Sequence, residues 1–251
     1  MKAAVVIAAF CVLASPVTIH AQRGGRGAPA PVAAREAAAL DLTGYWVSVV
    51  FEDWRLRMIT PKKGVYDTLT LNPEGRRVGD TWDPAKDEAA GEQCRAYGAA
   101  SIMRLPGRLH ITWQDANTLR VDTDTGTQTR LFHFGAAAAA PAPSEPNWQG
   151  QSAAVWELAP GARGSAPLGN LKVVTTNLRP GYVRKNGAPY SGQAVVTEYY
   201  DLNTMPNNDQ WMTVTTKVED PLYFSRPYLT TTDFKKLSSA SGWNPTPCSA
   251  R

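Results

Sequence analysis

The stretch that decides the fold is "RLHITWQDANTLRVDT", residues 108–123. Apolar and polar side chains alternate on both sides of "QDAN", which is typical of two strands joined by a tight turn. A three-residue loop at 115–117, with Asn117 left-handed, pairs Trp113 with Leu119 and gathers the apolar side chains on one face. A loop one residue shorter or longer would pair apolar residues with polar ones. The sequence therefore predicts an antiparallel hairpin in this register.

Runs rich in Val, Thr, Tyr and Trp recur between turn signals along most of the chain, which predicts an all-β fold. Besides the hairpin, at 108–114 and 118–124, we expect strands near 44–52, 66–71, 100–105, 127–134, 152–158, 171–178, 193–201, 210–219 and 227–235. Asp83 followed by Pro84 is typical of a helix start, so one or two short helices are expected near 73–94. We predict an antiparallel barrel or strongly curved sheet of about ten strands, although a sandwich with a polar outer face has the same pattern.

The first 40 residues are expected to lie outside the folded domain. Residues 1–21 have one charge at Lys2, a short apolar run and a small residue at Ala21. This pattern is typical of a secretory signal peptide, and the run is too short to span a bilayer, which needs about 20 residues. Residues 22–40 have almost no large apolar side chain, which predicts a flexible leader. We therefore expect a periplasmic or secreted protein with one β domain at 41–251 and no transmembrane segment.

The charge of the chain gives little support to nucleic-acid binding. The sequence has 26 basic and 22 acidic residues, a net charge of +4. Four of the basic residues but only one acidic residue precede Asp41, so the predicted domain has 22 basic and 21 acidic residues, a net charge of +1. A nucleic-acid partner requires a concentrated basic surface, and we expect no such partner.

Two cysteines, Cys94 and Cys248, lie beyond the predicted signal peptide, which itself contains Cys11. An even number of cysteines in an exported protein predicts a disulfide, with two unlinked thiols as the alternative. A bond that closes so long a loop stabilises by roughly 4 to 5 kcal/mol in the chain-entropy model. Neither cysteine belongs to a C-x-x-C pair, and the domain has only His110 and His133, so we expect no metal site.

Aromatic side chains are the candidate ligand contacts. Gly44 and Trp46 open a predicted strand in "DLTGYWVSVVFEDW", residues 41–54. Several later strands have mixed faces with Thr, Tyr and Trp, a pattern that fits a concave side lined for a ligand. The residues expected to line it are Trp46, Trp113, Tyr199 and Trp211.

A basic and aromatic loop, "LRPGYVRKNGAPYSG" at 178–192, is expected to gate this concave side. Its relevant side chains are Arg179, Tyr182, Arg184, Lys185 and Tyr190. Arginines grip carboxylates and other anions through two parallel hydrogen bonds, and tyrosines give an apolar platform. The alternative is a solvated connection in which Gly and Pro only make turns.

No catalytic motif is found in the sequence, which has no G-x-S-x-G, H-E-x-x-H, phosphate loop or dinucleotide fingerprint. Catalytic residues therefore stay unassigned, and no cofactor is expected. His110 lies opposite Asp122 in the favoured hairpin register, which predicts a charge-paired residue at the surface or mouth. His133, between Phe132 and Phe134, is the candidate general base of an alternative enzyme function.

Paired carboxylates occur in "FEDWRLRM", residues 51–58. Adjacent residues of a strand point to opposite faces, so Glu52 and Asp53 are not expected to act together as acid and base. We expect ion pairs with the neighbouring Arg55 and Arg57 instead.

Four motifs together resemble a family of secreted or periplasmic bacterial β-rich proteins of unassigned function. They are "NWQGQSAAVWE" (147–157), "LKVVTTNLRPGYVRKNGAPYS" (171–191), "TEYYD" (197–201) and "WMTVTTKVEDPLYFSRPY" (211–228). The resemblance covers most of the predicted domain and implies no activity.

A second resemblance, to lipocalin-like barrels, rests on the G-x-W of Gly44 and Trp46 and on "TEY" at 197–199. The chain departs from that pattern in residues 72–98 and in long loops after 134 and 158.

Three functions follow from these observations as hypotheses. The leading one is binding of a small, partly apolar or anionic ligand in the concave face of the barrel. The second is an enzyme on the same scaffold that uses His133 or a carboxylate as general base. The third is a structural or assembly protein of the cell envelope that buries exposed aromatic side chains on a partner.

Overall fold

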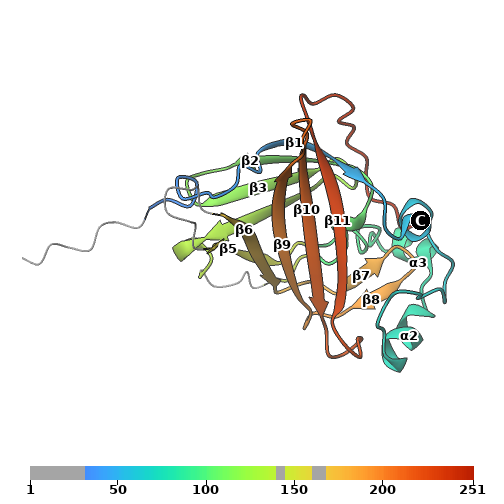
Figure 1. Cartoon of the computed structure of the whole chain (residues 1–251). Helices are drawn as coiled ribbons and strands as arrows, with labels where there is room; N and C mark the ends of the chain where they lie inside the picture. The colour runs from blue at the N-terminus through green and yellow to red at the C-terminus, as the bar shows by residue number, and fades with distance from the viewer. Residues whose placement is uncertain (1–31, 140–144, 160–167) are drawn as a thin grey trace, which may run out of the picture. The chain divides into compact units, whose positions relative to one another are not determined.

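Nine strands of the described residues close into a barrel (Figure 1). The computed structural model describes residues 32–139, 145–159 and 168–251, all within one compact unit. The barrel strands are β1 (Gly44–Val49), β2 (Arg108–Trp113), β3 (Thr118–Thr123), β4 (Gln128–Phe134), β5 (Gln151–Ala159), β6 (Leu168–Thr176), β9 (Val195–Thr204), β10 (Gln210–Glu219) and β11 (Tyr228–Leu237). The prediction of a barrel of about ten strands is confirmed. The predicted signal peptide lies outside the described residues.

The order of the strands is a meander with one detour. β6 pairs with β9 because β7 (Gly181–Arg184) and β8 (Ala188–Tyr190) form a hairpin of their own. β1 closes the ring by pairing antiparallel with both β2 and β11. Strand directions in a ring can alternate throughout only when the number of strands is even, so nine strands require a parallel pair. β4 and β5 are that pair, which corrects the predicted antiparallel arrangement at this position.

The hairpin that predicted the fold has the expected register. Trp113 pairs with Leu119, and His110 pairs with Asp122. The loop geometry differs in one detail, because Asn117 does not adopt a positive φ. Instead, its backbone N–H donates to Asp115 Oδ1 at 2.8 Å, and this side-chain turn closes the loop.

Two predicted strands are wrong. Residues 66–71 contain turns and a single bridge, between Leu71 and Phe224. Residues 100–105 contain the short 3₁₀ helix η1 (Ile102–Arg104). Both are short apolar runs, for which periodicity does not distinguish a strand from another buried segment. β7 and β8 occur where a gating loop was expected.

Three α-helices and a second 3₁₀ turn, η2 (Gly135–Ala137), complete the described elements. Helices α2 (Pro73–Gly79) and α3 (Pro84–Ala89) confirm the short helices expected near 73–94. The Asp83 side chain accepts from Ala85 N at 3.1 Å, as its position before Pro84 suggested. Helix α1 (Trp54–Met58) was not predicted, because residues 51–58 were interpreted as a strand. Asp53 takes a left-handed backbone, with φ of 50°, and ends the extended chain there.

Segments from outside the barrel cover both of its ends. At the β2–β3 turn, Ala34 N donates to Asn117 Oδ1 at 2.9 Å, and Ala34 O accepts from Trp156 Nε1 at 3.0 Å. At the other end of β3, the ring of Tyr97 packs against Gly126, whose positive φ and missing side chain make room for it. Ala34 and Tyr97 both belong to the barrel core. The folded part of the chain therefore begins before residue 41, within the range predicted as a flexible leader.

The predicted disulfide is confirmed. Cys94 and Cys248 are bonded across 154 residues of sequence. The bond joins the segment that leads into the buried residues 96–103 to the C-terminal tail, so it ties two loop regions together at one end of the barrel. In the described part of the chain, no helix has the length and apolar character needed to cross a membrane.

Candidate functional site

The predicted ligand-lining aromatics divide between the two faces of the barrel. Trp46 points inward, is fully buried and donates from Nε1 to Leu42 O at 2.9 Å. Trp113 also faces the core, where it packs against Phe134.

The predictions for Tyr199 and Trp211 are wrong. Their neighbours Tyr200 and Met212 are fully buried in the core, which leaves Tyr199 and Trp211 on the outer face. Tyr199 there lies under Lys172. The sequence did not decide between the faces, because both faces of these strands carry apolar and polar residues.

The barrel interior is filled at the level of Trp46. The large side chains that meet there, each with at most 1% of its area exposed, are Trp46, Ile111, Leu119, Arg130, Phe132, Leu171, Tyr200 and Phe234. A cavity that admitted water would leave exposed area on the side chains around it. The concave face therefore has no room for a ligand among these residues.

A charge pair is part of this filled interior. Arg130 donates from Nη1 and Nη2 to the two carboxylate oxygens of Glu198, at 2.9 and 2.6 Å, and neither side chain has exposed area. Burial alone would lower the pKa of Arg130, but the nearby Glu198 carboxylate raises it above its ordinary value. Thr175 accepts a further hydrogen bond from Arg130 at 3.4 Å. This bidentate pair links β4 to β9 across the core, while Arg130 Nε is buried without a hydrogen-bond partner among the described residues.

The two tyrosines of the predicted gating loop are buried rather than exposed. Tyr182 donates from its hydroxyl to Asp87 Oδ2 at 2.9 Å, and burial raises its pKa above the ordinary value. Tyr190 is buried in a second hydrophobic cluster beside the barrel. The β7–β8 hairpin places both rings in cores, so they do not form the predicted ligand platform.

The basic residues Arg179 and Arg184 of this loop lie in different places. Arg179 forms an ion pair with Glu92, and its guanidinium lies 4.6 Å above the Trp148 ring. Arg184 is buried at the end of β7 and lines a small cavity. The loop therefore does not bring Arg179 and Arg184 to one site.

The small cavity has a volume of about 40 Å³ and a cationic wall. Its basic lining residues are Arg57, Arg104, Arg184 and Lys185, and its other lining residues are Leu56, Thr60, Pro61, Ser101, Leu105 and Val183. Arg57 bonds Glu52 at 2.7 Å and Arg104 bonds Asp53 at 3.0 Å. The expected ion pairing of the two carboxylates is thus confirmed, with Arg104 in place of Arg55.

The charge of this wall is only partly balanced. Arg184 donates to Asp67 O at 3.1 Å and to Thr68 Oγ1 at 2.9 Å, both neutral acceptors. Burial lowers the pKa of Arg184 below its ordinary value, and it also lowers the pKa of Arg57 despite the opposing effect of Glu52. A guanidinium held among neutral partners favours an anion beside it.

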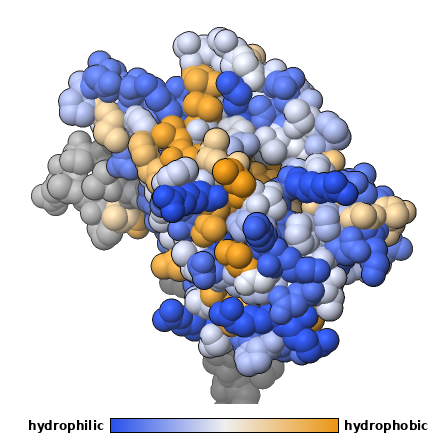
Figure 2. Space-filling model, turned by 90° about the vertical axis from the view of Figure 1, so that its right-hand side faces the viewer, coloured by the Kyte–Doolittle hydropathy of each residue, from blue (hydrophilic) through white to orange (hydrophobic). Residues whose placement is uncertain are grey.

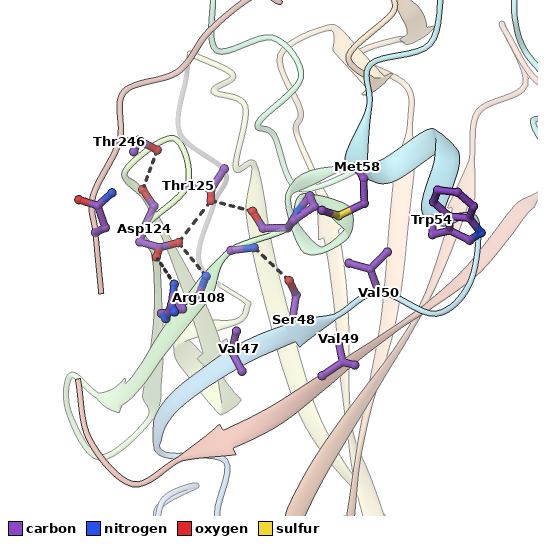
Figure 3. A pocket seen from close by; sticks show the side chains of 13 residues that line it. Val47, Ser48, Val49, Val50, Trp54, Met58, Arg108, Asp124, Thr125 and Thr246 are labelled. Carbon is purple, nitrogen blue, oxygen red and sulfur yellow. Dashed lines mark hydrogen bonds and ion pairs between the residues drawn. The ribbon is translucent and has the colours of Figure 1, made fainter. Parts of the chain in front are cut away.

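A larger hollow than this cavity is an open groove of about 750 Å³ beside β1 (Figure 3). Its apolar lining comes from Val47, Val49, Val50, Trp54, Met58 and Pro106, and its polar lining from Ser48, Gly107, Arg108, Asp124, Thr125, Asn244 and Thr246. β1, α1, the start of β2, the β3–β4 turn and the C-terminal tail therefore all contribute to it.

Polar groups at one side of the groove are held by one another. Arg108 N donates to Asp124 Oδ1 at 2.7 Å, and Thr125 Oγ1 donates to Pro106 O at 2.9 Å (Figure 3). The Arg108 guanidinium lies 3.9 Å from Asp124 Oδ2, and its Nε is buried without a hydrogen-bond partner among the described residues. These contacts fix the polar wall in one arrangement, as a preformed site requires.

Exposed apolar side chains lie beside this groove. Phe51, Trp54, Met58 and Ile59 are 64%, 54%, 59% and 70% exposed within nine residues of sequence. Phe51 stacks on the outer-face Trp211, with ring centroids 6.1 Å apart. Figure 2 shows apolar side chains in a band among charged ones on the face that it presents. A concentration of this kind is typical of a binding surface.

The two histidines have different surroundings. His110 stacks on Tyr45 with ring centroids 4.1 Å apart and lies next to Trp243. It pairs with Asp122 across the hairpin, as predicted. His133 contacts the Thr118 hydroxyl at 3.4 Å. Its strand neighbours Phe132 and Phe134 are buried in the core, so the His133 ring lies on the outer side of β4.

Sequence reasoning missed Trp54, Met58, Arg57 and Arg104 as site residues. One signal was available for Arg104, which stands in the apolar run "SIMRLPG", where a buried guanidinium needs acidic or anionic partners. Trp54 and Met58 gave no comparable signal, because α1 was not expected.

Comparison of the chain with known proteins identifies no matching family model, curated protein or solved structure.

Proposed function

We propose that the protein binds a small, partly apolar molecule in the open groove beside β1. The observation that supports this most directly is the groove itself, which combines apolar side chains such as Trp54 and Met58 with the fixed polar wall around Arg108. Its volume of about 750 Å³ lies within the range of small-molecule sites. The proposal keeps the ligand class expected from the sequence and moves the site from the inside of the barrel to its outside.

Export to the periplasm or beyond stays part of this proposal, as does membership of the family of exported bacterial β-rich proteins. The Cys94–Cys248 disulfide supports an oxidising compartment, because cytosolic thiols are kept reduced. The enzyme alternative draws no support from the surroundings of His133, whose hydrogen-bonding neighbour is a threonine hydroxyl.

The first test is native mass spectrometry of the protein purified from the periplasm, followed by melting-temperature measurements with lipids, quinones and aromatic acids. We expect a copurified small molecule, or a compound that raises the melting temperature by several degrees. Trp54→Ala should abolish the shift. Leu229→Ala removes a side chain that is 64% exposed and lies outside the groove lining, so this control should keep it. An equal shift in Trp54→Ala would rule out the groove.

A second function is favoured by the exposed side chains of Phe51 and Ile59, which do not line the groove. These residues suit docking of an apolar segment of an envelope partner. The double variant Phe51→Ala/Ile59→Ala distinguishes the two functions. A ligand-binding protein should keep its ligand-induced shift in this variant, whereas an assembly protein should lose a crosslinked partner that the wild type retains in intact cells.

A further inference from the structure

The small cavity next to α1 is separate from the groove. Leu56 and Arg57 line the cavity, whereas Trp54 and Met58 line the groove. The same division occurs at the start of β2, where Leu105 belongs to the cavity and Pro106 to the groove. Occupation of one site therefore does not require occupation of the other.

The residues that line this cavity carry positive charge and no negative charge. Four basic side chains line it, and the two carboxylates within ion-pair distance, Glu52 and Asp53, are each held by one arginine. Lys185 donates to the backbone oxygen of Arg251. Arg184 is 8% exposed and has no carboxylate within ion-pair distance in the part of the chain that the structure describes. The buried Arg184 guanidinium thus has no direct ion-pair partner among the described residues, an arrangement that is costly in a folded protein.

An unused donor lies on the same wall. Arg57 is 9% exposed, and its Nε and Nη1 donate to Arg104 O and Glu52. Its Nη2 is buried and has no hydrogen-bond partner among the described residues. Buried N–H groups are nearly always paired, so an unpaired donor on the wall of a cavity is a candidate contact for a bound acceptor.

The size of the cavity and its guanidinium groups favour a small anion with oxygen acceptors. A volume of about 40 Å³ admits a group somewhat larger than one water molecule. Guanidinium groups match the oxygens of carboxylates and phosphates, which accept several N–H bonds at once. Thr60 and Ser101 add polar residues to the lining, and Leu56 and Leu105 add apolar surface beside the arginines.

We propose that this cavity is a binding site for a small oxyanion, a carboxylate or phosphate group, held between Arg184 and Arg57 with Arg104 in support. This proposal keeps one prediction made for the loop at 178–192, the anion-binding role of Arg184. It does so with arginines from α1 and from the segment before β2, and without Arg179.

The test is isothermal titration calorimetry of the full-length exported protein with sodium phosphate, sodium acetate and sodium chloride at constant ionic strength. We expect saturable binding of phosphate or acetate, and at least tenfold weaker binding of chloride, which has no oxygen acceptors. Phosphate binding tighter than acetate assigns a phosphate site, and the reverse order assigns a carboxylate site. Equal heats for all three salts, or no saturable heat, would overturn the proposal.

Variants locate the binding. Arg184→Gln should weaken the oxyanion at least tenfold, and Arg184→Lys, which keeps the charge but loses the planar fork, should weaken it nearly as much. Arg179→Gln is the matched control, because Arg179 belongs to the same sequence motif but pairs with Glu92 outside the cavity. Arg57→Lys provides a second test of the wall if Arg184→Gln does not fold. Wild-type affinity in folded Arg184→Gln or Arg57→Lys would place the anion elsewhere and contradict the proposal.

Discussion

Two buried arginines of this protein have opposite surroundings. Arg130, inside the barrel, donates two short hydrogen bonds to Glu198, and both side chains are fully buried. Arg184, beside the small cavity, donates to Asp67 O and Thr68 Oγ1 and forms no ion pair with a carboxylate among the described residues. The first charge has a carboxylate partner in direct contact, whereas the second has no carboxylate within ion-pair distance among the described residues. A buried charge therefore indicates a site only after its partners have been counted.

The largest effect on this comparison should come from loosening the region around Arg184 and the small cavity. The Cys94–Cys248 bond ties down the segment leading to Ser101 and Arg104 of the cavity wall. Replacing both cysteines by serine should lower the free energy of unfolding by roughly 4 to 5 kcal/mol, because the denatured chain regains the freedom of a very long loop.

Urea unfolding of the variant and of the wild type measures this loss. The reduced wild type should behave like the double variant. A loss below about 1 kcal/mol in both samples would mean that the tail is held by packing alone, contrary to the chain-entropy model.

The next largest effect should come from the paired arginine. Arg130→Met leaves the Glu198 carboxylate buried without its partner, so we expect a loss of roughly 3 to 5 kcal/mol in the free energy of unfolding. Arg130→Met combined with Glu198→Leu removes both charges and should regain most of this loss, since apolar replacements of buried pairs are often nearly neutral. Urea unfolding of the two variants checks both values. Equal free energies of unfolding for the single and the double variant would show that the unpaired Glu198 charge does not cause the loss.

The smallest effect should come from the unpaired arginine. Arg184→Met in buffer without oxyanions leaves no buried carboxylate behind and removes the hydrogen bonds to Asp67 O and Thr68 Oγ1. We expect a loss of about 1 to 2 kcal/mol in the free energy of unfolding, the net cost of these lost hydrogen bonds. Differential scanning calorimetry compares the stability loss of Arg184→Met with that of Arg130→Met under the same conditions. A loss as large as that of Arg130→Met would mean that Arg184 is a structural residue balanced by charges further away.

The sequence was most informative where local pattern determines structure. The Trp113–Leu119 register followed from alternation, because a slip of one residue exposes the apolar face. Asp83 before Pro84 marked a helix start through local capping chemistry. The Cys94–Cys248 bond followed from the even number of cysteines in a domain that is expected to be exported.

Predictions failed where long-range packing decides. Tyr199 and Tyr200 are adjacent and chemically alike, and only the register against β6 and β10 selects which ring enters the core. The position of Arg184 next to Arg57 depends on how the β7–β8 hairpin docks beside α1, two segments far apart in sequence. No local pattern carries this information, so an anion-binding role was predicted for Arg184 but not for Arg57 and Arg104, the other two arginines of the cavity.

The first strand of the barrel has consequences for how the protein is made. β1 pairs with β2 and also with β11, so Tyr45 lies beside both His110 and Leu237. One hydrogen-bonding edge of β1 therefore stays open until nearly all of the chain has been synthesised. An open strand edge is a template for unwanted pairing between chains. A chain of this topology should therefore depend on chaperones during its biogenesis, and overproduction should lead to aggregation of incomplete barrels rather than of finished ones.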